Sequence, residues 1–189
     1  LVDPDQRLAL LFDGRLDNRE ELLAALDRRD EQQLSDAALA FLAYQRWGEH
    51  CFERFLGPFA VVIHDAVQHQ MVMARDVLGD RTLFYTLDQR LLLIASEECA
   101  LLTHPAVPRN VDESSICLFM ALKTPEDGRT FFSAIKELPL AHVMTVDRDR
   151  VRCWRHSQVK VTDRLRYRSD EEYAEHFLEL LTQSVRCRL

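Results

Sequence analysis

The sequence lacks the features that mark membrane proteins and nucleic-acid-binding proteins. No apolar run approaches the roughly 20 residues that a membrane-spanning helix needs, and no signal-peptide pattern opens the sequence as given. Lys and Arg number 24 against 31 Asp and Glu, for a formal net charge of −7. Because the basic residues are scattered, the sequence shows no positive stripe of the kind that binds a phosphate backbone. We therefore expect no membrane and no nucleic-acid partner.

Cysteine is present without any spacing that points to a disulfide framework or a zinc site. The five residues are odd in number and include no C-x-x-C pair: Cys51, Cys99, Cys117, Cys153 and Cys187. The seven histidines show no metal-ligand spacing either, so we expect no metal in this chain. A reducing, cytoplasmic location is the simplest expectation, and each thiol is expected to be buried or semi-buried.

Hydrophobic residues make up 47% of the 189, and no low-complexity tract interrupts them. This is enough for one packed domain of ordinary size, with room for part of a second. Four short apolar segments follow one another between Phe55 and Ser96, separated by tight polar turns. We expect them to form one antiparallel meander, because parallel partners need crossovers of a dozen residues or more. In the turn Arg75-Asp76-x-x-Gly79, the first two residues are expected to be structural.

Further elements are predicted from caps and apolar spacing. A strand over 8–12 ends at Asp13-Gly14, a capping box at Asn18 begins a short helix, and Ser35-Asp36 begins a second helix that ends at Gly48. Helical turns are expected from Glu97 and from Asp112, followed by a hairpin of strands 142–146 and 151–154.

The last part of the sequence changes character. Residues 157–168 are polar and basic without a period, which is typical of a linker. Ser169-x-x-Glu172 then begins a helix with an apolar stripe at Tyr173, Phe177, Leu181 and Val185. Such a stripe needs a partner surface, so we expect the sequence to be an excerpt of a longer protein.

Taken in order, the blocks resemble the glutamine amidotransferase half of asparagine synthetase and its relatives. The matching blocks are Asp13-Gly14-Arg15 with Asp17-Asn18, Ser35-Asp36, 57–65, 75–85, Ala95-Ser96-Glu97 and 139–142. Each block alone is weak, whereas their order and spacing are specific and cover nearly the whole chain.

The resemblance implies an α+β fold, an Ntn-hydrolase-like sandwich of two antiparallel β-sheets flanked by helices. Residues 1–160 would be a type 2 glutamine amidotransferase domain, incomplete at its N-terminus. Residues 161–189 would be a linker and the first helix of an ATP-pyrophosphatase (asparagine synthase) domain. The nucleophile of the family is an N-terminal cysteine, expected upstream, so no catalytic nucleophile is expected among these residues.

The implied activity is that of a ligase in asparagine biosynthesis, the glutamine-hydrolysing, ATP-dependent amidation of aspartate. This part would release ammonia from glutamine and would be inactive alone. Glutamine, aspartate and ATP would be the substrates, with ATP and Mg²⁺ bound only in the downstream domain. Family members are often homodimers, which leaves a homodimer open here. The alternatives are an inert scaffold of a β-lactam synthetase or peptide-cyclase type ligase, and a stand-alone binding module, which the amphipathic last helix disfavours.

The resemblance also places site residues. Gly14 matches a glycine whose N–H binds the oxyanion, but the asparagine that should assist it is Asp13, and an ionised carboxylate cannot donate a hydrogen bond. Asp36 matches the aspartate that holds the α-amino group of glutamine. Arg15 stands where the family has glutamate, a charge reversal that, like Asp13, favours the scaffold alternative. Without the resemblance, Asp13-Gly14 is a simple turn and Asp36 a first-turn helix acid.

Overall fold

The computed structural model describes residues 1–189 except 6, 89, 124–127, 159–164 and 189. The chain divides into two units, Leu1–Ser157 and Gln158–Leu189, which are described separately. Half of the linker predicted over 157–168, residues 159–164, lies outside the described residues. The elements of the first unit are β1 (Leu8–Gly14), α1 (Arg19–Ala25), α2 (Asp36–Trp47), the 3₁₀-helix η1 (Gly48–Arg54), β2 (Phe59–Asp65), β3 (Gln70–Arg75), β4 (Phe84–Leu87), β5 (Leu92–Ala95), α3 (Glu98–Leu102), α4 (Glu113–Met120), β6 (Lys136–Glu137), β7 (His142–Val146) and β8 (Val151–Arg155).

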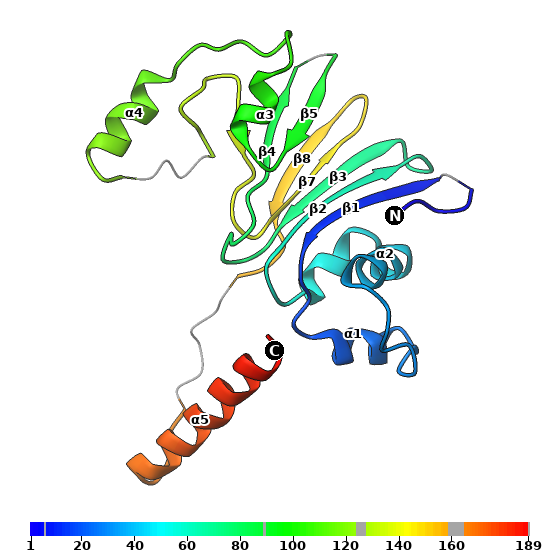
Figure 1. The fold of residues 1–189 in the computed structure, drawn as a ribbon, viewed down its shortest axis with the longest axis vertical. Coiled ribbons are helices and arrows are strands. Elements are labelled where there is room, and N and C mark those ends of the chain that lie inside the picture. The colour runs from blue at the N-terminus through cyan, green and yellow to red at the C-terminus, as the bar shows by residue number, and fades with distance from the viewer. Residues whose placement is uncertain (6, 89, 124–127, 159–164, 189) are drawn as a thin grey trace. The chain divides into compact units, whose positions relative to one another are not determined.

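Two antiparallel sheets form the centre of the first unit. The larger has the strand order β1-β2-β3-β7-β8 and the smaller β5-β4-β6. Figure 1 shows α1 and α2 on one side of the five-stranded sheet, with the three-stranded sheet and α3 beyond its other side. The predicted α+β sandwich of two antiparallel sheets flanked by helices is confirmed.

Three apolar clusters hold these layers together, and β2 contributes to two of them. Phe59, Val61 and Ile63 pack with α1, α2 and η1, whereas Ala60 and Val62 face the second sheet. Because both faces of β2 are covered, the strand reads as an unbroken apolar run rather than an alternating one. A third cluster packs α3 on the outer face of the smaller sheet.

The prediction of one four-stranded meander is wrong. β2 pairs with β3 and β4 with β5, but β3 takes β7 as its second neighbour, with Met73 opposite Met144. The chain leaves the larger sheet at Asp76, whose carboxylate accepts the N–H groups of residues 78–81 and of Phe59. These bonds hold a compact turn that delivers β4 to the other sheet.

Three helix starts are capped as predicted, by Ser35, Asp112 and Ser169, and one, at Asn18, is not. The Ser35 hydroxyl accepts the Ala38 N–H at 3.2 Å and begins α2. The side chain of Asn18 makes no cap bond. It donates instead to the carbonyl of Arg54 (2.9 Å) and accepts the N–H of Leu56 (3.0 Å). Asn18 therefore ties the connection after β1 to the segment that leads into β2.

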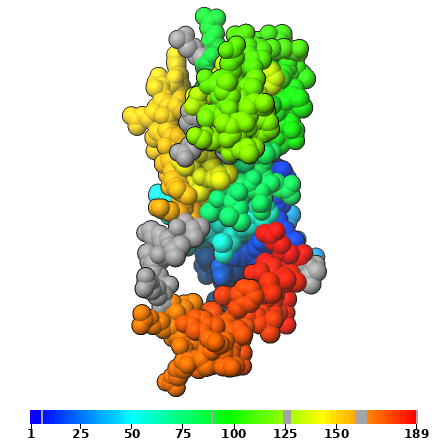
Figure 2. All heavy atoms as spheres, turned by 90° about the vertical axis from the view of Figure 1, so that its left-hand side faces the viewer, coloured from blue at the N-terminus to red at the C-terminus, as the bar shows by residue number. Residues whose placement is uncertain are grey.

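Two helices carry exposed apolar side chains. In the first unit, Ile116, Phe119 and Met120 of α4 are exposed, and Figure 2 shows this helix in yellow-green, uncovered on the face toward the viewer. In the second unit, the predicted amphipathic helix is α5 (Asp170–Arg186), with its apolar stripe exposed. That α5 opens a second domain stays a prediction. Across the described residues, no helix is both long and apolar enough to cross a membrane.

Candidate active site

The end of β1 is pressed against the segment before β2, and this makes a glycine necessary at position 14. Gly14 has φ of +145°, and a Cβ built there would lie 2.2 Å from the carbonyl oxygen of Pro58. Directly after this contact the Arg15 N–H donates to Pro58 O (2.8 Å) and the Asp17 N–H to Leu56 O (2.7 Å). Residues 14–17 therefore run tightly along residues 56–58.

The N–H of Gly14 points away from the sheet. β1 is an edge strand, and the bond from Arg15 to Pro58 makes Gly14 and Phe59 a pair that exchanges no hydrogen bonds. The same alternation turns the Leu10 N–H outward, where it donates to Leu1 O at 2.8 Å. Gly14 thus presents its N–H at the outer edge of β1, beyond the stretch that the first residues of the chain cover.

Asp13 lies beside an arginine that reaches it from the turn after β3. Its Oδ1 is 3.8 Å from Arg81 Nε, and both side chains are about half exposed. The backbone of Arg81 is held at both ends of the residue, since its N–H donates to Asp76 Oδ2 (3.2 Å) and its carbonyl accepts from Arg75 Nε (2.6 Å). The turn therefore fixes the position of the Arg81 backbone, from which the side chain extends.

Asp36 lies in the first turn of α2 and joins it to the segment after Gly14. One carboxylate oxygen accepts the Leu16 N–H at 3.0 Å. The other accepts a hydrogen bond from the Arg19 guanidinium, which also donates to Gln32 O at 3.2 Å. Both oxygens are thus engaged by groups of the chain itself, and the side chain of Asp36 is 20% exposed.

Aspartates and arginines alternate around this strand end and pair with one another. Three ion pairs of the described residues lie here, Arg15–Asp17, Arg19–Asp36 and Arg81–Asp13. Because each acid faces an arginine, the charge reversal at Arg15 is accompanied by a partner of opposite sign. These six side chains together carry no net formal charge.

Arg75 and Asp76 connect the two sheets behind this strand end. Arg75 is buried; it pairs with Glu137 of β6 (Nη1–Oε1, 2.7 Å) and donates to the carbonyls of Leu138 (2.9 Å) and Gly79 (3.1 Å). Together with the five N–H groups that Asp76 accepts, these contacts support the predicted structural role. They orient the turn that carries Arg81.

Residues 1–157 match the model of the family described as "Glutamine amidotransferase domain". The chain belongs to this family. The amidotransferase domain is 32% identical over 156 residues to asparagine synthetase [glutamine-hydrolyzing] 3 of Bacillus subtilis (strain 168), a match that covers 80% of this chain and 25% of that protein. Asparagine synthetase [glutamine-hydrolyzing] 2 of the same organism is 26% identical over 200 residues, covering 98% of this chain and 26% of that protein.

Other relatives carry different names. The amidase chry2 of Gibberella zeae is 28% identical over 159 residues, covering 82% of this chain and 23% of that protein. The chain thus spans about a quarter of the length of these curated relatives. Among solved structures, the glutamine phosphoribosylpyrophosphate amidotransferase of Bacillus subtilis, complexed with ADP and GMP, superposes with a TM-score of 0.55 at 18% identity, covering 84% of this chain and 31% of that one. This likeness shows the fold, and the predicted family is confirmed.

Two residues of the amidotransferase domain that contact this region were missed by sequence reasoning. One is Arg81; its only signal was its place at the end of the Arg75-Asp76 turn. The other is buried His156, whose Nε2 lies 2.9 Å from the carbonyl of Arg75 and whose Nδ1 has no hydrogen-bond partner among the described residues. Burial beside Phe52 lowers the pKa of His156.

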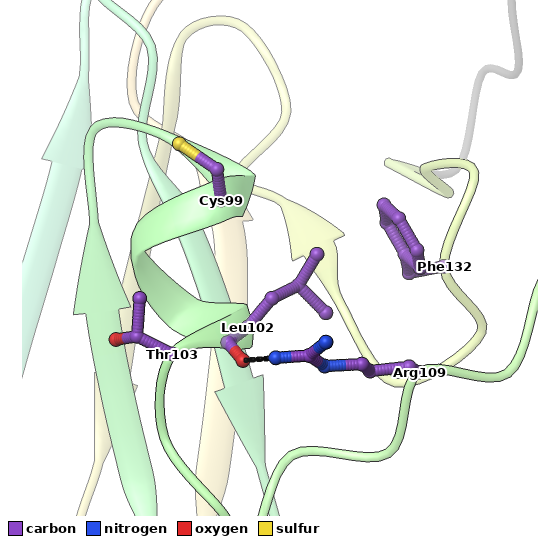
Figure 3. Close-up of a pocket in the computed structure, with 5 residues that line it drawn as sticks. All are labelled: Cys99, Leu102, Thr103, Arg109 and Phe132. Carbon is purple, nitrogen blue, oxygen red and sulfur yellow. Dashed lines mark hydrogen bonds between the residues drawn. The ribbon is translucent and has the colours of Figure 1, made fainter.

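Two pockets of the amidotransferase domain lie elsewhere. A shallow apolar pocket of about 290 Å³ is lined by Cys99, Leu102, Thr103, Arg109 and Phe132 (Figure 3). A second of about 410 Å³ opens between β4 and the segments at 106–108 and 133–136. Neither is lined by Asp13, Gly14 or Asp36.

The cysteines and histidines of the described residues form no metal site. No group of three or more His, Cys, Asp or Glu side chains in the described part could hold a metal ion. All five cysteines are free; Cys51 is buried, and burial raises the pKa of its thiol. Cys99, Cys117 and Cys153 are exposed, so the expectation of buried or semi-buried thiols is wrong for these three.

Proposed function

We propose that the first unit is a glutaminase domain, which hydrolyses the side-chain amide of glutamine and releases ammonia. The observation that carries the proposal is the N–H of Gly14 at the outer edge of β1. A donor held in place at a strand edge is what an oxyanion needs, because its orientation costs nothing at the moment of reaction. Its position is held by the backbone bonds that tie Arg15 to Pro58 and Asp17 to Leu56.

The nucleophile in this proposal is the cysteine that the family carries as its first residue, outside these 189 residues. An α-amine has a pKa of about 7.7–8.0 and can take the thiol proton near neutral pH. The thiolate then adds to the amide carbon. The α-ammonium returns its proton to the amide nitrogen as the tetrahedral intermediate collapses, so that the C–N bond breaks and ammonia is released. Water hydrolyses the thioester to glutamate and restores the thiol.

Asp36 is the residue proposed to hold the α-amino group of glutamine. The carboxylate of Asp36 is partly exposed in the first turn of α2, and its negative charge attracts an ammonium group. It has to share that carboxylate with Arg19, which already donates to one oxygen. Glutamine binding through Asp36 therefore requires either a shared geometry or displacement of Arg19.

For the full-length protein we propose an asparagine synthetase-like ligase. The names of the two Bacillus subtilis relatives support this assignment. Ammonia would amidate aspartate after ATP, with Mg²⁺, activates its carboxylate in a following domain, to which residues 161–189 would contribute α5. We further propose a cytoplasmic protein, with a homodimer as the assembly to test.

A second candidate is the inert scaffold of a ligase of β-lactam synthetase or peptide-cyclase type, whose nitrogen comes from its own substrate. Two observations favour it. Asp13 cannot donate to an oxyanion while ionised, and Arg19 occupies the carboxylate that the glutamine ammonium would use. In this case the domain keeps its fold and has no glutaminase chemistry.

The experiment that separates the candidates uses the full-length protein. N-terminal sequencing with an intact mass establishes the first residue, and glutamate release from glutamine is measured at neutral pH. A processed N-terminal cysteine with glutamate release is the expected result, and a serine at that position serves as the inactive control. A different first residue, or a cysteine without glutamate release, would overturn the glutaminase and leave the scaffold.

A further inference from the structure

In the candidate oxyanion site, the carboxylate of Asp13 opposes the role proposed for Gly14. Gly14 offers a backbone donor, but the side chain next to it in sequence is a carboxylate, which repels a developing negative charge. A site with one donor and one adjacent anion stabilises a tetrahedral intermediate poorly. Some other group must either supply a donor or neutralise Asp13.

We propose that Arg81 is that group: its guanidinium donates the second hydrogen bond to the oxyanion, and Asp13 acts as the residue that positions it. This inference rests on the proposed glutaminase function. Arg81 Nε lies 3.8 Å from Asp13 Oδ1, so the two form an ion pair at the residue that precedes Gly14. An aspartate–arginine pair thus takes the place of a single amide side chain.

The backbone of Arg81 is held firmly enough for such a role. Its N–H and its carbonyl are both bonded, to Asp76 and Arg75 respectively, within the turn that joins the two sheets. Arg75 is in turn buried and paired with Glu137. The side chain therefore extends from a fixed point toward the end of β1, and only its own rotamers remain to be ordered.

The chemistry of the guanidinium fits the requirement. Arginine carries five N–H donors in one rigid plane and remains protonated at all working pH values. Its contact with Asp13 is through the Nε side, which leaves donors at the terminal nitrogens. When the thiolate adds to the amide carbon, a C–S bond forms and the carbonyl π electrons move to oxygen. The positive charge of Arg81 stabilises that oxygen until the C=O bond reforms and nitrogen leaves.

The test is a double-mutant cycle on the full-length protein, measured as kcat and KM for glutamate release. Arg81→Met removes the donors but keeps much of the side-chain length, and is expected to lower kcat by about 10²–10³-fold with KM changed little. Asp13→Asn introduces an amide donor, so the double variant Asp13→Asn/Arg81→Met is expected to recover most of the lost kcat. Arg150→Met, at the exposed turn between β7 and β8, is the control for loss of an arginine.

The outcomes separate this inference from the function on which it rests. A wild-type protein that releases no glutamate overturns both. An active wild-type protein with an unaffected Arg81→Met variant overturns the role of Arg81 alone. Equal losses in the single and double variants, with a lowered Tm in each, assign Arg81 to folding and also overturn the donor role.

Discussion

Asp76 is the residue whose replacement tests the architecture most directly. It is buried, with 2% of its surface exposed, and accepts five backbone N–H groups. The Phe59 N–H is buried, so losing its acceptor costs about 1–3 kcal/mol, whereas the four turn donors can bond to water and cost about 0.5 kcal/mol each. We therefore expect Asp76→Ala to lower the free energy of unfolding by about 3–5 kcal/mol, a large part of the 5–15 kcal/mol typical of a domain.

The assay is urea unfolding followed by tryptophan fluorescence, because Trp47 and Trp154 both lie in the first unit. Asp80→Ala is the matched control: it removes an exposed acid from the same turn and should change the unfolding free energy by no more than about 0.5 kcal/mol. Asp76→Asn keeps the shape and should fall between the two. A loss below about 1 kcal/mol in Asp76→Ala would refute the claim that this carboxylate holds the turn.

Two further predictions concern Gly14 at the end of β1 and the buried His156. Gly14→Ala should cost about 2–4 kcal/mol in thermal or urea unfolding, because its Cβ meets the Pro58 carbonyl at 2.2 Å, whereas Gly48→Ala, also at positive φ but in open space, should cost only about 1 kcal/mol; equal losses would contradict the steric argument. Burial lowers the pKa of His156 below its ordinary 6.5, so as the pH falls below about 6.5 the unfolded chain takes up a proton first and the unfolding free energy decreases. His156→Gln, which keeps a donor for the Arg75 carbonyl, should remove that part of the pH dependence, and an unchanged profile would show that His156 is not its source.

The parts of the fold that sequence predicted well are those with local signals. The helix from Ser35, the strand over 8–12 and the late hairpin depend on caps and apolar spacing within a few residues. The single meander failed because strand pairing between β3 and β7 is decided by residues far along the chain. A turn of the length of 76–83 suits a hairpin equally well, and nothing in its spacing shows that Asp76 directs it to another sheet.

The residues of the candidate site also differ in whether local sequence indicates them. Gly14 and Asp36 could be proposed from sequence because they lie within short motifs whose order resembles a family. Arg81 and His156 were missed because what distinguishes them is contact with Asp13 and with Arg75, across large separations in sequence. The pairing of Asp36 with Arg19 could not be predicted from sequence either, because an arginine in the first turn of a helix is common. Their roles in chemistry stay predictions.

The order of strands in the larger sheet also has a consequence for how the chain reaches its fold. β1, β2 and β3 are close in sequence and can associate early. The second neighbour of β3 is β7, which lies far along the chain and pairs its Val146 with Met71 of β3. During synthesis the smaller sheet and α4 emerge before that partner does. Until β7 arrives, the edge of β3 is an open template for other chains. We expect folding to be slow for a domain of this size, with the closing of the β3–β7 pair as its late, aggregation-sensitive step.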